Sequence, residues 1–195
     1  MASLLAELRP SVASFPDRDG YLTADPERVA RWEAELEALG PGLKIGLHWK
    51  SLLMTGSRAR YFSSFDRWRP VLETPGAIMV NLQCGDVAAD LAEAGAAGVR
   101  IWTPPFDLKD DLEDLAAMSC ALDLVVGPGI AGTNIAAAVG ARTWMLTAPD
   151  DWHLLATDRY PFYPHARLFR RAFDGWPASI AEVRAALDRA VAGDW

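Results

Sequence analysis

The sequence predicts an α/β protein with a parallel sheet and helices on both of its faces. Two observations lead to this prediction. Apolar runs of strand length alternate along the chain with segments of helical periodicity, and the runs lack the polar alternation of a half-exposed strand. Strands of that kind are buried on both faces, as in parallel sheets whose connections are helices. The 195 residues are enough for one domain with a substantial core.

An irregular segment and one helix are expected before the first strand. Residues 1–24 contain two prolines and a glycine, and they predict no regular structure. Asp25 as N-cap and Pro26 in the first turn then predict a helix, because the side chain satisfies free N–H groups and the proline is tolerated there. Gly40 and the proline after it end this helix.

Strands and helices alternate from there to the end of the chain. We expect strands at Leu43–His48, Ala77–Leu82, Val99–Trp102, Leu122–Val126, Thr143–Leu146 and Arg167–Phe169. We expect helices at Asp86–Ala97, Leu108–Ala121, Thr133–Val139 and Ser179–Ala192, and a helix or turn at Phe65–Leu72. This order is typical of a Rossmann-like sheet, in which ligands bind beyond the carboxyl ends of the strands at the switch point.

Composition excludes several classes of protein. A net charge of −7 argues against a general nucleic-acid binder, which needs a basic face. No apolar stretch approaches the roughly 18 residues of a membrane span. Residues 1–10 contain Glu7, Arg9 and no adequate apolar run, so we expect no signal peptide. Cys84 and Cys120 lack metal spacing and are expected to be reduced thiols, so we expect a cytoplasmic protein.

The loop after the first expected strand carries three cations. Lys50, Ser51, Arg58 and Arg60 would suit a phosphate or pyrophosphate, since they combine positive charge with hydrogen-bond donors. The alternative is a solvated basic loop without a ligand.

The loops after the second and third expected strands are polar. Gln83 and Asp86 are candidates to meet a base or a sugar, although Asp86 also suits a helix cap. The third loop combines prolines with Asp107, Asp110 and Asp111. Its backbone and apolar groups would hold a nucleobase, and a carboxylate would take a ribose diol. The alternative is that these carboxylates only start the next helix; without a histidine among them we expect no metal site.

The turn after the fourth expected strand has the geometry of an anion site. Strand, glycine-rich turn and helix N-terminus bring free N–H groups and the positive end of the helix dipole to one point. Its residues are Gly127, Pro128, Gly129, Ile130, Ala131, Gly132, Thr133 and Asn134. None carries a charge, so binding would come from backbone N–H groups, Thr133 and Asn134. The alternative is a tight turn that needs glycine only for its conformation.

The histidines predict no catalytic group. His48, His153 and His165 are dispersed, and their spacing supports no pairing with a serine, cysteine or carboxylate. We expect each to be structural or exposed. The aromatic stretch Trp152–Phe169 is expected to serve packing rather than to form a sugar platform.

Together these loops resemble the C-terminal half of GT-B glycosyltransferases. The chain is most similar to the heptosyltransferase-like domains at the end of bacterial tetratricopeptide-repeat glycosyltransferases. The matching stretches, spread over about residues 43–175, are Lys44–Ser51, Val80–Gly85, Asp107–Asp114, Ala121–Val125, the glycine turn with Ile135–Gly140, Pro149–Trp152 and Phe162–Arg170. Their order and spacing carry the resemblance.

The resemblance implies a nucleotide-sugar donor site. Lys50 and Ser51 would approach the diphosphate, Asp107 and Leu108 would face the base and ribose, and the glycine turn would hold the donor phosphates. The reaction implied is an inverting, metal-independent sugar transfer to a protein or polysaccharide acceptor, with no cofactor besides the donor.

The resemblance also implies an incomplete enzyme. The acceptor site, and commonly the catalytic base, lie in an N-terminal half that would precede this domain. Residues 1–40 would be the interdomain connector with its leading helix, and residues 41–195 the nucleotide-sugar-binding domain.

One departure from the family pattern concerns the turn itself. Heptosyltransferases usually show Asp-Thr-Gly-Pro-x-His there, whereas this chain has Gly129 at the acid and Asn134 at the histidine. We therefore expect the turn to bind rather than to react. The loss leaves open a non-catalytic interaction domain that retains the fold. A third reading, an epimerase of related fold, would need acids and bases that the turn does not supply.

Overall fold

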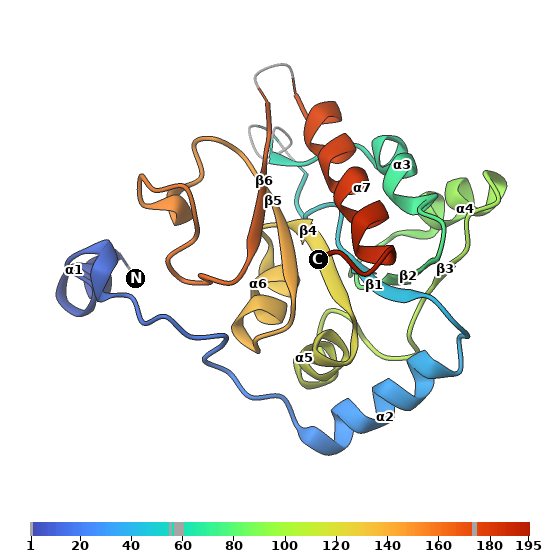
Figure 1. Cartoon of the computed structure of the whole chain (residues 1–195), viewed down its shortest axis with the longest axis horizontal. Coiled ribbons are helices and arrows are strands. Elements are labelled where there is room, and N and C mark those ends of the chain that lie inside the picture. Colours follow the sequence, from blue (N-terminus) through green and yellow to red (C-terminus); the bar gives the residue numbers. More distant parts are fainter. Residues whose placement is uncertain (1, 55, 57–60, 173–174) are drawn as a thin grey trace.

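The computed structural model describes residues 2–54, 56, 61–172 and 175–195. Over these residues the chain forms one parallel sheet with the strand order β3-β2-β1-β4-β5-β6 (Figure 1). The strands are β1 (Leu43–Leu47), β2 (Ala77–Asn81), β3 (Ile101–Trp102), β4 (Leu124–Pro128), β5 (Thr143–Thr147) and β6 (Arg167–Arg170). The α/β fold and the parallel sheet predicted from the sequence are confirmed.

The order of the strands places a switch point between β1 and β4. β1 pairs with β2 on one side and with β4 on the other, and the register opposite β4 joins Ile45 to Leu124 and Leu47 to Val126. After β1 the chain adds β2 and β3 on one side of it, and then adds β4, β5 and β6 on the other side. Loops after β1 and β4 therefore diverge at the carboxyl edge and leave a crevice there.

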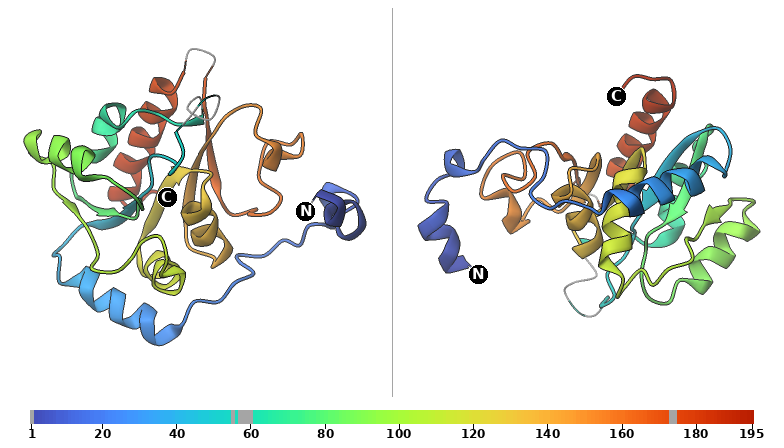
Figure 2. Two further views of the ribbon diagram at one scale, coloured as in Figure 1. Left: turned by 180° about the vertical axis from the view of Figure 1, so that it is seen from behind. Right: turned by 90° about the horizontal axis from the view of Figure 1, so that it is seen from below.

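Helices connect these strands. They are α1 (Ala2–Leu8), α2 (Pro26–Glu37), α3 (Arg69–Leu72), α4 (Ala88–Ala96), α5 (Leu112–Ala121), α6 (Ala131–Ala138) and α7 (Pro177–Val191). Short 3₁₀ helices occur at η1 (Val12–Ser14), η3 (Phe65–Trp68) and η4 (Trp152–Leu154). Two views of the ribbon show α7 on the face of the sheet opposite α2, α5 and α6, with α1 apart from the rest (Figure 2). No described helix is long and apolar enough to cross a membrane.

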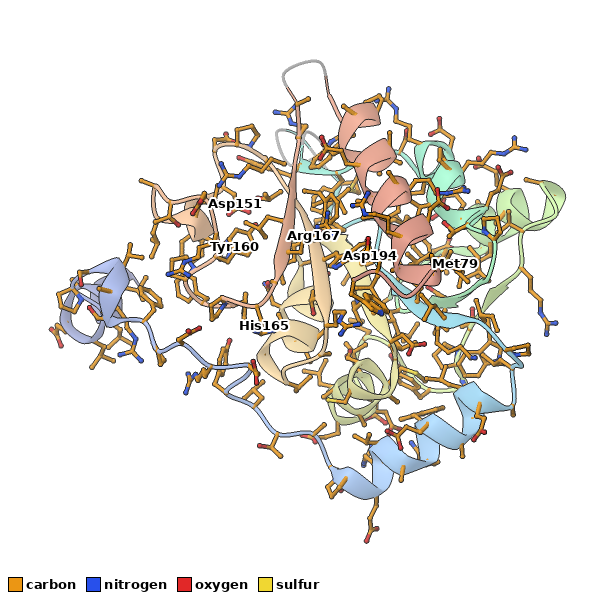
Figure 3. The ribbon with its side chains drawn as sticks, viewed as in Figure 1. Met79, Asp151, Tyr160, His165, Arg167 and Asp194 are labelled. Atoms are coloured by element: carbon orange, nitrogen blue, oxygen red, sulfur yellow. The ribbon has the colours of Figure 1, made fainter. Side chains whose placement is uncertain are left out.

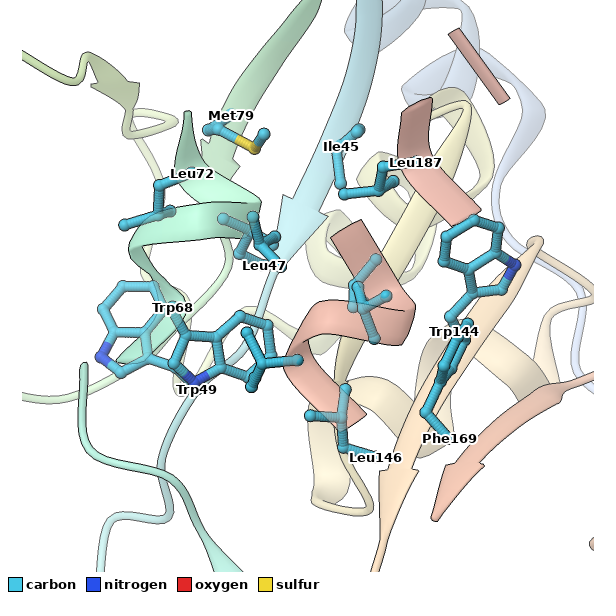
Figure 4. Packing of buried hydrophobic residues seen from close by; sticks show 14 of the residues in the cluster. Ile45, Leu47, Trp49, Trp68, Leu72, Met79, Trp144, Leu146, Phe169 and Leu187 are labelled. Carbon is cyan, nitrogen blue, oxygen red and sulfur yellow. The ribbon is translucent and has the colours of Figure 1, made fainter. Parts of the chain in front are cut away.

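One face of the sheet packs against α3, α4 and α7. Ile180, Val183 and Leu187 recur at helical spacing on α7 and are fully buried against the strands. Figure 4 shows Leu187 beside Ile45 and Trp144 beside Phe169 in this cluster.

On the other face, a buried carboxylate fastens α2 to α5. Asp114 Oδ1 accepts hydrogen bonds from Arg31 at 2.5 Å and from Trp32 Nε1 at 3.2 Å, and it lies 3.0 Å from Arg28. Burial opposes its ionisation, but these donors and charges outweigh burial and hold the pKa of Asp114 below its usual range. Part of the expected connector, residues 1–40, therefore packs on the sheet domain; its linking role stays a prediction.

Several expected boundaries were wrong by two residues or more. Residues 1–24, for which no regular structure was expected, contain α1 and η1. α5 begins at Leu112, because Asp107 accepts from the N–H groups of Lys109 and Asp110 in a turn, and Asp111 is the true cap. α6 begins at Ala131, two residues earlier than expected, because the extended Ile130 is its N-cap residue.

Candidate functional site

A cavity of about 400 Å³ lies at the switch point of the sheet. Its walls come from the loops after β1, β2, β3 and β4, so the predicted convergence of these loops is confirmed. Of the residues singled out from the sequence, the cavity is lined by Lys50, Ser51, Gln83, Leu108, Gly129, Ile130, Ala131, Gly132 and Asn134. We call this the larger cavity, to distinguish it from a smaller cavity beside it that is described below.

The N-terminus of α6 forms one wall of the larger cavity. Ile130 is the N-cap with extended backbone, so Ala131 is the first helical residue and its N–H has no partner within the helix. Ala131 is exposed and Asn134 is half-buried. Free N–H groups at the positive end of an eight-residue helix favour an anion here.

Two members of the predicted turn lie elsewhere. Gly127 and Pro128 belong to β4 rather than to the turn. Thr133 is completely buried, and it does not line the larger cavity. Its hydroxyl points toward Gly127, where a Cβ atom would lie 3.0 Å from Thr133 Oγ1. The structure therefore places Thr133 behind the turn, and any contact with a ligand would need the helix to move.

A buried histidine shapes the same wall. His48 is 2% exposed at the end of β1, and its ring fills the space that a side chain at position 132 would take. A Cβ atom on Gly132 would lie 2.3 Å from His48 Cε1. Neither ring nitrogen has a hydrogen-bond partner among the described residues. Burial alone lowers the pKa of His48 to about 3, so the ring is neutral.

Lys50 and Gln83 shape the cavity through contacts of their own. Gln83 is buried, and its Oε1 accepts from the backbone N–H groups of Trp49 and Lys50, at 3.0 Å and 2.9 Å. Lys50 Nζ donates to Asp90 Oδ2 at 2.6 Å and to the carbonyl of Asp86. Gln83 thus fixes the loop that carries Lys50, and Asp90 offsets the charge that Lys50 presents to a ligand.

The remaining predicted site residues divide into three groups. Leu108 lines the larger cavity, whereas Asp107 is exposed and engaged in its own turn outside the lining. Asp86 accepts from the N–H of Ala88, but the N-cap of α4 is Val87, so the expected capping position was wrong by one residue. Arg58 and Arg60 lie outside the described residues. The binding roles of all these residues stay predictions.

A second, smaller cavity of about 230 Å³ adjoins the first. Both cavities are lined by Phe62 and Gly129, so they meet at the start of the glycine turn. The smaller one extends under the loop after β5 and is also lined by Tyr61, Thr147, Asp150, Asp151, Trp152 and His153.

The smaller cavity contains a histidine–carboxylate pair that sequence reasoning missed. Asp151 Oδ1 lies 2.6 Å from His153 Nδ1, and Asp151 Oδ2 accepts from Tyr160 at 2.5 Å and from Thr147 at 2.9 Å. Figure 3 shows Asp151 and Tyr160 on the same side of the molecule, in the loop after β5. The signal in the sequence is the Asp-x-His spacing in the loop after a buried strand; of the two residues, only His153 lies in the stretch Trp152–Phe169 that is expected to serve packing.

These hydrogen bonds set the protonation of Asp151 and Tyr160. Burial by itself raises the pKa of Asp151, but donors from His153, Tyr160 and Thr147 outweigh it and hold this pKa well below its usual range. Burial and the neighbouring carboxylate raise the pKa of Tyr160. Asp151 is therefore ionised and Tyr160 is protonated at neutral pH.

The sequence is similar to that of a protein from Caulobacter. Protein FlbA of Caulobacter vibrioides is 47% identical over 190 residues, which is 96% of this chain and 32% of FlbA. The chain thus spans about a third of the length of this relative. No protein-family model matches the chain.

Solved structures of glycosyltransferases share its architecture. ADP-heptose lipopolysaccharide heptosyltransferase II of E. coli superposes with a TM-score of 0.62 at 13% identity, over 95% of this chain and 58% of that one. A family 9 glycosyl transferase from Veillonella parvula gives 0.59 at 12% identity, over 86% and 47%. E. coli heptosyltransferase WaaC with ADP gives 0.52 at 13%, over 94% and 54%. At such low identity the likeness shows a glycosyltransferase-like fold and nothing finer.

Proposed function

We propose that this chain is the nucleotide-sugar-binding domain of a glycosyltransferase that transfers the sugar to a protein or polysaccharide acceptor. The observation that carries the proposal is the larger cavity, where the free N–H groups of α6 meet three other loops at the switch point. Its place in the sheet suits a nucleotide, and the N-terminus of α6 suits a diphosphate. The shared fold of the solved glycosyltransferases is consistent with this use.

In this proposal the main contribution of this chain to the reaction comes from its backbone N–H groups. N–H groups at Ala131 and its neighbours would bind the diphosphate and stabilise the charge that develops on it as the sugar departs. Lys50 would add a cation, weakened by Asp90. Leu108 would lie against the base or ribose. Inverting transfer without a metal, an acceptor site and base on a separate N-terminal half, and a cytoplasmic location are parts of the same proposal.

Calorimetry with UDP, GDP, ADP and CMP and with their sugar conjugates tests the proposal. We expect one base to bind, and we expect Ala131→Pro to weaken that binding about tenfold, since a hydrogen bond to a charged group contributes roughly 1.5–3 kcal/mol. Proline at the first helical position removes the N–H but keeps the helix, and the extended backbone of Ile130 accepts a following proline.

Ala131→Ser, which keeps the N–H, is the matched control. If none of these nucleotides binds, the donor-site proposal is wrong. That result would favour a non-catalytic interaction domain, the alternative that the replacement of an acid by Gly129 and of a histidine by Asn134 already motivates.

A further inference from the structure

The first helix of the chain is short and largely uncovered. α1 has seven residues and lies apart from the sheet and from the other helices (Figure 2). Isolated helices shorter than about 12–15 residues are marginal in water, so a helix of this length depends on an element that packs against it. Leu4 and Leu8 lie one helical turn apart, and they are 56% and 62% exposed. α1 therefore presents apolar surface that a packing partner would cover.

This helix forms one wall of an apolar groove of about 550 Å³. Another wall comes from the loop after β5, through Trp152 and Phe162. Phe15 connects the two walls, because its ring meets the edge of the Phe162 ring at a centroid distance of 5.0 Å. Two segments that are far apart in the sequence thus build one groove, which we call the apolar groove.

Trp152 is an open ring on the apolar groove. The stretch Trp152–Phe169 was expected to serve packing, and Tyr160 and Tyr163 are indeed buried. Trp152 is 63% exposed, so the expectation was wrong for this residue. Its ring stacks on that of His153 with centroids 3.9 Å apart, and it also lines the smaller cavity. A partner in the apolar groove would therefore contact a ring that borders the smaller cavity.

The charges that line the apolar groove are positive. Of its described lining residues only Arg9 and Arg18 are charged, in a chain whose net charge is −7. Arg9 lies over the ring of Phe15 at 5.9 Å, and Arg18 lies over the ring of Tyr21 at 5.0 Å. Neither guanidinium forms an ion pair with a described carboxylate. The charge of the groove is therefore complementary to a partner that carries carboxylates beside an apolar face.

The shape of the apolar groove favours a helix as this partner. A volume of about 550 Å³ lies within the roughly 300–1,000 Å³ of sites that bury what they bind. Side chains at positions i, i+3, i+4 and i+7 of a second helix would interdigitate with the leucines of α1 and fill the space between the walls. A flat lipid surface would meet the exposed leucines but would leave that space unfilled.

We propose that the apolar groove binds an amphipathic helix of a partner protein whose apolar face is bordered by glutamate or aspartate. The apolar side chains of this helix pack between α1 and Trp152, and its carboxylates meet Arg9 and Arg18. Exposed ion pairs of this kind add little affinity, but they select the partner by charge. The inference is independent of the nucleotide site, because the apolar groove and the larger cavity share no described lining residue.

Two synthetic peptides with the same helical pattern test the proposal. Both place leucines at i, i+3, i+4 and i+7, and these are bordered by glutamates in one peptide and by lysines in the other. Fluorescence anisotropy of the labelled peptides measures their affinity for the chain at low salt. We expect the glutamate peptide to bind about tenfold more tightly, since attraction to two arginines replaces repulsion from them. Arg18→Glu should remove most of this preference.

Leu8→Ser tests the apolar part of the groove. We expect it to weaken binding of the glutamate peptide about tenfold, because a buried leucine contact is lost. Leu53→Ser is the matched control, since Leu53 is also 62% exposed but does not line the apolar groove. Both positions are exposed, so neither change should unfold the chain. Equal effects of the two variants would show that the peptide binds elsewhere.

Equal affinity for the two peptides, or binding of neither, would overturn the proposal. Two other occupants would give results of their own. If the chain alone sediments as a dimer that Leu8→Ser dissociates, a second copy fills the apolar groove and the proposed partner is wrong. If the chain binds vesicles of phosphatidylglycerol, and Leu8→Ser but not Leu53→Ser prevents this, the surface meets lipid and the proposed partner is again wrong.

Discussion

The two cavities that meet at Gly129 are held open in opposite ways. The larger is shaped by backbone packing: Gly132 lets α6 approach a neutral, buried His48, and the ligand-facing groups are N–H donors. The smaller is shaped by side-chain hydrogen bonds that converge on the ionised Asp151. The shape of the larger cavity therefore depends on how closely backbone and side chains pack, and the shape of the smaller cavity depends on which groups carry the protons of its hydrogen bonds. Variants that alter the packing at the larger cavity or the hydrogen bonds at the smaller cavity, each without changing the other, test this difference.

The largest effect is expected from Gly132→Ala. The added methyl would lie 2.3 Å from His48 Cε1, so the ring or the start of α6 must shift, at a cost of about 3 kcal/mol in the free energy of unfolding. Urea unfolding measures this. Gly95→Ala is the matched control, because nothing lies within 4 Å of its Cβ in α4 and alanine favours helix by about 0.5–1 kcal/mol.

If the clash with His48 is the cause, His48→Val should restore much of the stability of Gly132→Ala. Independent, additive losses in the double variant would show that the two residues do not share one space.

A smaller effect is expected from pH. The pKa of His48 is about 3 when folded and near 6.5 when unfolded, so below pH 6.5 the unfolded chain binds a proton that the folded chain refuses. Stability therefore falls as pH falls through this window, by about 2 kcal/mol between pH 7.5 and pH 5. The difference in this slope between the unmodified chain and His48→Val isolates the contribution of His48.

The same pH range distinguishes the effect of His48, beside the larger cavity, from that of Asp151, beside the smaller cavity. Asp151 has a folded pKa below its unfolded value, so its stabilising contribution is present above pH 4 and is lost only at lower pH. An identical pH dependence in His48→Val and the unmodified chain above pH 5 would contradict the neutral, buried state of His48.

The smallest effect is expected from Tyr160→Phe. It removes the hydroxyl that donates to Asp151 and reaches Thr147, and we expect a loss of about 1 kcal/mol in unfolding free energy. Tyr163→Phe is a matched control, since among the described residues that hydroxyl bonds only to the hydroxyl of Tyr21. An effect of Tyr160→Phe no larger than the control's would indicate that the hydrogen-bonded cluster does not hold the smaller cavity.

The fold was largely predictable because its signals are local. Unalternated apolar runs marked most of the strands. Asp25 and Pro26 marked the start of α2, where Asp25 does accept from the N–H groups of Glu27 and Arg28. Boundaries failed where a side chain competed for the same backbone groups. Asp107 draws two N–H groups into a turn, so α5 begins four residues later than its acidic segment indicated.

The candidate site was only partly predictable. Most turn residues do line the larger cavity, because strand order alone brings the loops to one edge. Thr133 lies outside the lining, and Gln83 bonds to backbone N–H groups of the loop after β1. No sequence pattern distinguishes a side chain that faces a cavity from one that fixes its wall. The pair of Asp151 and His153 was overlooked, since its partners Thr147 and Tyr160 are brought together by the folded loop.

The sequence by itself determined the parallel α/β sheet, the edge at which its loops converge and the uncharged glycine turn at that edge. These follow from hydrophobic pattern and backbone freedom, which act between near neighbours in the chain. Only the tertiary structure decided that His48 occupies the space left by Gly132, that Asp114 fastens α2 to α5, and that Asp151 stands beside Gly129. Those outcomes depend on which atoms share a volume from which water is excluded, and residues far apart in sequence decide that together.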